Sequence, residues 1–144
     1  MSHWKLYYHL VWSTKNREPV IGPKREQYVR ESIRLTCEES SVIQYELGIM
    51  PDHVHLFVAL PPTVSLSSFM HRIKGGSSHY IRIREQNKSF EWQRQFGAYT
   101  IHENQIPKLI EYVRNQSAHH SSNSLYANLE ITERAFPQTP ANAI

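Results

Sequence analysis

The sequence lacks the features of several protein classes. It contains a single cysteine, Cys37, among 144 residues, which excludes a disulfide scaffold and any zinc module built from several cysteines. No apolar run approaches the roughly 20 residues of a membrane-spanning helix. Residues 1–5 lack the charged and then apolar layout of a signal peptide. We therefore expect a soluble, cytoplasmic protein without a membrane span.

Nucleotide-binding and low-complexity patterns are also missing. The chain has only five glycines and no Gly-x-x-x-x-Gly-Lys-Ser/Thr sequence, so no P-loop is expected. Apolar residues make up 40% and charged residues 20% of the chain, a composition typical of globular proteins. The length suits one domain. We expect that domain to span residues 1–144, with a core over about residues 4–120 and a weakly structured tail over 121–144.

The net charge of +3 is unevenly distributed along the chain. Residues 1–36 carry seven basic and three acidic side chains, a net charge of +4. Residues 37–60 carry four acidic and no basic side chains, and residues 61–95 carry six basic and two acidic ones. Two basic segments thus flank an acidic one, a pattern that permits a nucleic-acid partner without requiring it.

The spacing of apolar residues predicts four strands and three helices. Strands are expected over residues 4–13, 42–50, 53–60 and 96–102, and helices over 24–40, 65–85 and 103–120. Gly75-Gly76 predicts a kink in the second helix or the close approach of another backbone. The order β-α-β-β-α-β-α predicts an α+β fold, a ferredoxin-like sheet with an additional C-terminal helix.

The strand expected over residues 53–60 carries two candidate metal ligands, His53 and His55. Residues i and i+2 of a strand share one face, so both imidazoles point the same way. Val54, Leu56 and Val58 then point toward a core on the other face. Two imidazoles on one face can hold a divalent metal; the alternative interpretation is a pair of ordinary hairpin histidines.

The helix expected over residues 103–120 carries a second candidate pair, Tyr112 and Gln116. These residues stand four apart and therefore lie on one helix face. That face is predicted to lie beside the apolar stripe and separate from it, at about 100° per residue. The stripe consists of Ile106, Leu109, Ile110 and Val113. A tyrosine that only filled the core would more naturally lie on the stripe itself. Taken alone, however, this pair is better interpreted as an amphipathic tyrosine at the core margin with a solvated Gln116, and a functional tyrosine is the alternative.

Together these residues resemble a known family. His53-Val54-His55, then Lys74-Gly75, then Tyr112-x-x-x-Gln116 are similar to the HUH single-tyrosine transposases of short insertion sequences. Their REP-associated relatives are similar too. The stretch over residues 8–17, Tyr-His-Leu-Val-Trp-Ser-Thr-Lys-Asn-Arg, resembles the family's first strand and its basic exit. The resemblance covers roughly residues 4–120, in the same order.

The resemblance implies a transposase that cleaves and rejoins single-stranded DNA with hairpin ends. Tyr112 would attack a backbone phosphate and form a 5′-phosphotyrosine link, while His53, His55 and Gln116 would hold Mg²⁺ or Mn²⁺, with no nucleotide. A phenol with a pKa near 10 is mostly protonated at neutral pH, so a nearby cation is chemically useful. The family's arrangement also implies a homodimer whose active sites are shared between subunits.

Five basic residues are candidates for DNA contacts: Lys15, Arg17, Arg72, Lys74 and Arg82. Phosphate contacts from such residues give a salt-dependent affinity. Lys74 stands out because the stretch over residues 74–78 resembles the family's basic, glycine and serine segment. Three aromatic side chains are candidates for stacking on unpaired bases, with ordinary core packing as the alternative: Trp92, Phe96 and Tyr99.

Other functions on the same fold remain open at this point. An RNA-recognition module needs an aromatic-rich strand pattern that is absent here. A two-histidine phosphoesterase needs two separated His-x-Ser/Thr units, and only His119-His120-Ser121 fits. The alternative is a non-catalytic or domesticated relative that binds hairpin DNA or RNA.

Overall fold

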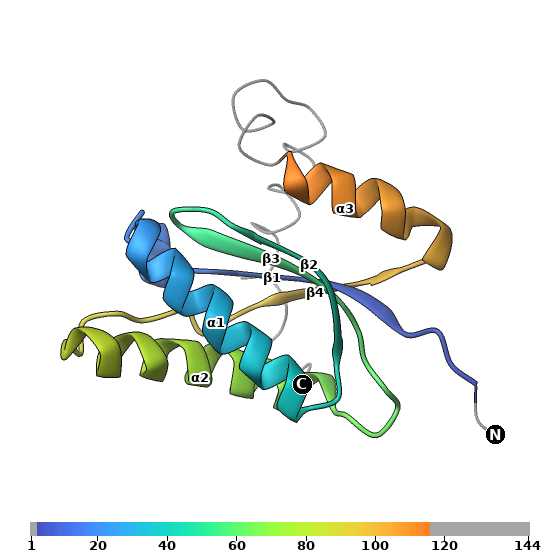
Figure 1. Ribbon diagram of the computed structural model, residues 1–144, viewed down its shortest axis with the longest axis horizontal. Coiled ribbons are helices and arrows are strands. Elements are labelled where there is room, and N and C mark those ends of the chain that lie inside the picture. Colours follow the sequence, from blue (N-terminus) through green and yellow to red (C-terminus); the bar gives the residue numbers. More distant parts are fainter. Residues whose placement is uncertain (1–2, 116–144) are drawn as a thin grey trace.

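The computed structural model describes residues 3–115, in which four antiparallel strands form one sheet. The strands are β1 (Tyr7–Ser13), β2 (Ile43–Ile49), β3 (His53–Ala59) and β4 (Gly97–Ile101), in the spatial order β2-β3-β1-β4 (Figure 1). The helices are α1 (Pro23–Glu39), α2 (Leu66–Glu85) and α3 (Ile106–Arg114), with 3₁₀ turns η1 (Lys15–Arg17) and η2 (Glu103–Gln105). This topology confirms the predicted ferredoxin-like α+β fold.

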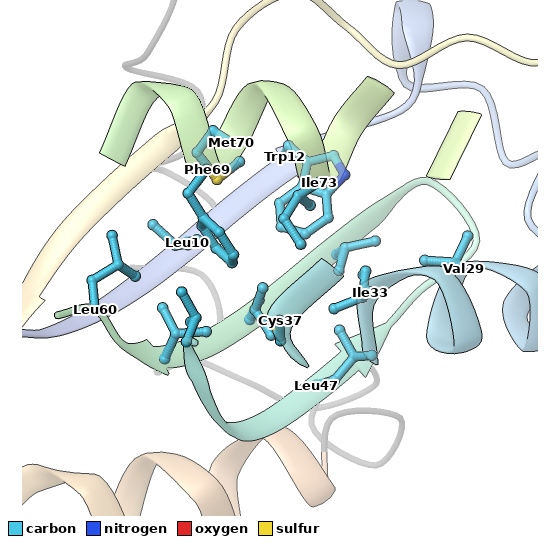
Figure 2. Packing of buried hydrophobic residues seen from close by; sticks show 14 of the residues in the cluster. Leu10, Trp12, Val29, Ile33, Cys37, Leu47, Leu60, Phe69, Met70 and Ile73 are labelled. Atoms are coloured by element: carbon cyan, nitrogen blue, oxygen red, sulfur yellow. The ribbon is translucent and has the colours of Figure 1, made fainter. Parts of the chain in front are cut away.

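The main hydrophobic core lies between one face of the sheet and the helices α1 and α2 (Figure 1). Side chains alternate along β3, so Val54, Leu56 and Val58 all face this core, and each is at most 1% exposed. Figure 2 shows Leu10 and Trp12 of β1 packed among side chains from both helices. The labelled helical side chains are Val29, Ile33, Cys37, Phe69, Met70 and Ile73.

The helix α2 begins at a capped end and runs without interruption for 20 residues. The Ser65 side chain accepts a hydrogen bond from the Ser68 backbone N–H, which satisfies one of the donors at the helix start. A Cβ atom on Gly76 would lie 3.5 Å from Thr36 Oγ1 of α1. The neighbours of Gly76 are thus side chains of α1, at ordinary contact distance, and neither the predicted close approach of another backbone nor the predicted kink is observed at the glycine pair. No helix among residues 3–115 is long and apolar enough to cross a membrane.

The helix α3 lies on the opposite face of the sheet (Figure 1). A second, smaller cluster joins it to β3 and contains the buried residues Phe57, Tyr112 and Val113. The third helix is predicted to begin at residue 103, and the structure has the 3₁₀ turn η2 there, followed directly by α3. The last part of that predicted helix, residues 116–120, and the predicted tail over 121–144 lie outside the described residues.

The position of Tyr112 on its helix corrects one prediction. The periodicity of α3 placed this side chain beside the apolar stripe and separate from it. In the structure Tyr112 is 5% exposed and Val113 is 4% exposed, so both belong to the buried face of the helix. The reason is that Phe57 extends the apolar surface of the sheet under the helix, beyond the width of the stripe itself.

Candidate active site

The two histidines of β3 lie side by side on the face of the sheet that α3 occupies. Their ring centroids are 5.0 Å apart and the rings are nearly perpendicular, at 83°. Both side chains are fully buried. The register places His53 opposite Ser13 and His55 opposite Val11 of β1. The alternation of β3 thus brings the two predicted ligands together.

Each imidazole is held through its Nδ1 atom by a neighbouring side chain. His53 Nδ1 lies 2.6 Å from Asp52 Oδ1, and His55 Nδ1 lies 2.8 Å from His9 Nε2. Metal-binding histidines are commonly oriented by such a contact at the ring nitrogen that does not bind the ion. The arrangement therefore assigns Nε2 of both rings as the atoms suited to coordination.

His9 is a site residue that the sequence analysis did not single out. Its ring stacks on Phe57, with centroids 4.5 Å apart, and meets His55 edge to edge, with centroids 5.0 Å apart. Burial lowers the pKa of His9 to about 3, so its ring is neutral at pH 7. A neutral imidazole keeps one nitrogen as a hydrogen-bond acceptor.

The loop after β1 also reaches the histidines. Arg17 Nη2 lies 3.5 Å from Asp52 Oδ2, on the carboxylate whose other oxygen contacts His53. The Thr14 backbone N–H donates to the Asp52 carbonyl oxygen at 2.9 Å. Asn16 and Arg17 adopt left-handed backbone angles, with φ of 57° and 53°. Such angles are unusual for residues other than glycine. They turn the basic segment after β1, which carries Lys15 and Arg17, back toward the turn between β2 and β3.

Tyr112 lies on the same side of the sheet as the two histidines. It packs with Phe57, which follows His55 by two residues on β3 and therefore shares its face. Phe57 also stacks on His9, so one aromatic ring touches both the tyrosine helix and the histidine cluster. Gln116, the predicted third ligand, lies outside the described residues.

The geometry of the histidine pair fits a shared metal ion. Two imidazoles that bind one ion through Nε2 at about 2.1 Å, with bond angles of about 90–110°, hold their ring centres roughly 5 Å apart. The observed separation of His53 and His55 is 5.0 Å. Within the described part of the chain, no three His, Cys, Asp or Glu side chains form a metal-binding group. The separation of the pair is therefore compatible with two ligands of one ion, and no third His, Cys, Asp or Glu side chain among residues 3–115 completes such a group.

The predicted DNA-binding residues fall into two groups. Arg17 reaches the histidine cluster through Asp52, and Lys15 stands two residues before it and pairs with Glu91 at 2.8 Å. The other three lie on α2, across the sheet from the histidines, and each donates to a protein oxygen. These bonds join Arg72 to Ser40 (2.6 Å), Lys74 to the carbonyls of Arg94 (2.8 Å) and Gln95 (3.1 Å), and Arg82 to the carbonyl of Phe90 (3.0 Å).

The aromatic candidates divide in the same way. Trp92 and Phe96 pack against the main core, and Trp92 Nε1 donates to Ser77 Oγ at 2.8 Å. Tyr99 of β4 instead lies on the face of the histidines, with its ring centroid 5.9 Å from that of His9. Of the three, Tyr99 is thus the one beside the candidate site.

Comparison with known proteins decides the family. The profile of the family described as "Transposase IS200 like" matches residues 2–116. The chain belongs to this family. The resemblance to single-tyrosine transposases and their REP-associated relatives is thereby confirmed, and membership makes the protein a transposase, an enzyme that cleaves DNA.

Named relatives agree with this assignment. This transposase is 29% identical over 122 residues to the transposase for insertion sequence element IS200 of Salmonella typhimurium, covering 80% of this chain and 79% of the relative. It is 24% identical over 119 residues to the ISDra2 transposase TnpA of Deinococcus radiodurans, covering 78% of this chain and 85% of the relative.

Solved structures share the fold of this transposase. A crystal structure of a Deinococcus radiodurans R1 protein named as a transposase superposes with a TM-score of 0.65 and 24% identity, covering 80% of this chain and 93% of the other. The REP-associated tyrosine transposase bound to a REP hairpin superposes with a TM-score of 0.62 and 19% identity, covering 83% of this chain and 74% of the other.

Proposed function

We propose that this transposase cleaves and rejoins single-stranded DNA through a 5′-phosphotyrosine intermediate formed by Tyr112. Family membership supports the DNA-cleaving activity. The observation that carries the finer proposal is that Phe57, two residues from His55 on one strand, shares a buried cluster with Tyr112. One face of the sheet thus presents both the histidine pair and the helix that carries the tyrosine.

The proposed reaction exchanges one phosphodiester for another. The Tyr112 hydroxyl oxygen forms a bond to the backbone phosphorus, and the bond from phosphorus to the 3′ oxygen of the preceding nucleotide breaks. The phenol proton passes to solvent water, and the departing 3′ oxygen takes up a proton from solvent water to become a hydroxyl. Rejoining reverses these steps with a new 3′-hydroxyl, and the similar energies of the two esters make a nucleotide cofactor unnecessary.

We propose that His53 and His55 hold a divalent ion through Nε2, with Gln116 as a third ligand. When bound, Mg²⁺ or Mn²⁺ supplies positive charge that offsets the charge on the phosphate. Asp52 contacts Nδ1 of His53 and His9 contacts Nδ1 of His55, the nitrogen of each ring that would not bind the ion. Two nitrogens and one amide oxygen leave positions open for phosphate oxygens and water, as a catalytic site requires.

The DNA contacts are proposed to begin at the loop after β1. Arg17 lies next to the histidine cluster, through its contact with Asp52, and Lys15 precedes it in the same turn. Lys74, Arg72 and Arg82 lie on α2 on the other side of the sheet. For these three, a role in DNA binding requires a strand that passes around the molecule to α2.

The proposed assembly is a homodimer with shared active sites. In the described residues β2 and β4 form the two edges of the sheet, where a second copy can add a strand. Within one chain, α3 packs on its own sheet near β2. Analytical ultracentrifugation of the full chain tests the dimer, which predicts a sedimenting species of twice the chain mass; a monomer at all concentrations would contradict it.

A second candidate function is the binding of hairpin DNA without cleavage. The observation that favours it is the burial of Tyr112, whose side chain is 5% exposed. A buried tyrosine must move or be uncovered before it can reach a phosphate. This candidate predicts tight binding of a hairpin-bearing strand and an intact strand after long incubation with Mn²⁺.

Cleavage of a labelled single strand separates the two candidates. The probe is a single strand copied from the DNA that flanks the gene, chosen for an imperfect palindrome and labelled at its 3′ end. We expect a labelled covalent protein–DNA band with Mn²⁺, its loss with EDTA, and its loss in Tyr112→Phe with binding retained. A strand with a scrambled palindrome is the control for recognition. Cleavage that persists in Tyr112→Phe would refute the assignment of the nucleophile.

A further inference from the structure

The contact between His9 of β1 and His55 of β3 contains one hydrogen, and the ring that carries it determines whether His55 can bind a cation. His9 Nε2 and His55 Nδ1 are 2.8 Å apart, and both side chains are almost completely buried. Two ring nitrogens at this distance share one hydrogen, because neither two protons nor two lone pairs can face each other there. Either His55 donates to His9 or His9 donates to His55.

The two arrangements differ in what the far side of His55 offers. If Nδ1 of His55 carries the hydrogen, Nε2 of the same neutral ring has a lone pair and can bind a cation. If His9 carries it, Nε2 of His55 bears a hydrogen and cannot bind a cation. Coordination through Nε2 therefore requires His9 to accept the hydrogen bond.

The surroundings of His9 also restrict how its own ring can turn. Phe57 stacks on the face of the His9 ring, with centroids 4.5 Å apart and the planes 21° apart. His55 meets the edge of the same ring, with the planes 22° apart and the two nitrogens in contact. Tyr99 lies 5.9 Å away on the β4 side. Tilting the flat ring away from the face of Phe57 would open a gap or create a clash in a packed interior, so the ring keeps the plane in which its Nε2 faces His55.

We infer that His9 is a positioning residue, which sets the tautomer and the orientation of His55 so that its Nε2 can bind the catalytic divalent cation. The inference rests on the proposed metal-binding role of the histidine pair. His9 itself touches neither the cation nor the DNA. Its contribution is to keep the ligand ring in the one state that can coordinate.

The tautomer of His55 in the wild-type protein gives the first test and needs no substitution. Long-range ¹⁵N–¹H correlation NMR of the metal-free full chain distinguishes a hydrogen on Nδ1 from a hydrogen on Nε2. We expect His55 to carry its hydrogen on Nδ1 at pH 7. A wild-type His55 that carries it on Nε2 would overturn the inference.

Two substitutions separate the hydrogen bond from the packing. His9→Phe keeps a flat ring on the face of Phe57 but removes the acceptor, whereas His9→Gln can place an amide oxygen close to the position of Nε2. Loss of such an orienting contact typically lowers metal affinity by about 10- to 100-fold. We expect that loss of Mn²⁺ affinity, measured by calorimetry, in His9→Phe and a smaller loss in His9→Gln. His79→Phe, at an exposed histidine of α2, is the matched control and should bind as the wild type does.

The outcomes distinguish this inference from the proposed function. If His55→Ala binds Mn²⁺ as tightly as the wild type, the proposed metal site fails and the inference about His9 fails with it. If His55→Ala loses Mn²⁺ but His9→Phe binds it normally, the metal site stands and the inference fails. Circular dichroism checks the fold of each variant. Should His9→Phe not fold, the wild-type tautomer and His9→Gln carry the test.

Discussion

Acid should destabilise the folded chain through His9, and the magnitude follows from the burial of this ring. Burial lowers the pKa of His9 to about 3 in the folded protein, against about 6.5 for an exposed histidine. Between these values the unfolded chain binds more protons, so the free energy of unfolding falls as the pH falls from about 6.5 toward 3. At about 1.36 kcal/mol for each pH unit, the loss between pH 7 and pH 5 is about 2 kcal/mol.

Urea unfolding at pH 7 and pH 5 measures this contribution when the wild type is compared with His9→Phe. Other groups titrate over the same range, and the comparison removes those that the two proteins share. We expect the stability lost between the two pH values to be about 2 kcal/mol smaller in His9→Phe than in the wild type. The exposed control, His79→Phe, should lose as much as the wild type. Equal losses in the wild type and in His9→Phe would refute the reasoning.

Three further predictions concern packing, helix propensity and DNA contacts. Phe57→Ala should lower the free energy of unfolding, measured by urea unfolding, by about 3–5 kcal/mol, because Phe57 is 3% exposed and joins His9 to α3. A decrease of less than about 1 kcal/mol would contradict that packing. Gly75→Ala should raise it by about 0.5–1 kcal/mol, since a Cβ there meets no atom within 4 Å, and a decrease would show that the helix needs this glycine. Arg17→Gln should weaken binding of a hairpin-bearing single strand and lower the salt slope by about 0.7. Arg30→Gln, at an exposed arginine of α1 that is not a candidate for DNA contact, should change neither; equal effects of the two in a fluorescence anisotropy titration would contradict the proposed DNA path.

Much of the fold could be predicted from the sequence, because the relevant patterns are local. Alternation along residues 53–60 fixes which side chains of β3 face the core, and it thereby brings His53 and His55 together. Helical spacing locates α1 and α2 to within a residue or two. The order of these elements then leaves few ways to build a sheet, and the observed strand order is the ferredoxin-like one.

The features that local patterns miss all depend on contacts between distant segments. The pair His9 and His55 is 46 residues apart and meets only because β1 and β3 align in a particular register. The approach of Arg17 to Asp52 depends on two left-handed backbone angles that no residue type demanded. The burial of Tyr112 is decided by Phe57 on the sheet, which the periodicity of α3 alone does not contain.

The central claim is that the phenol of Tyr112 becomes joined to DNA, and the most direct measurement identifies the joined residue. Full-length protein is incubated with Mn²⁺ and the hairpin-bearing strand, denatured, digested with nuclease and trypsin, and analysed by mass spectrometry. Trypsin releases residues 109–114, in which Tyr112 is the one tyrosine. We predict that this peptide carries the 5′-linked nucleotide remnant. A cut strand with the remnant on another peptide, or on none, would contradict the claim.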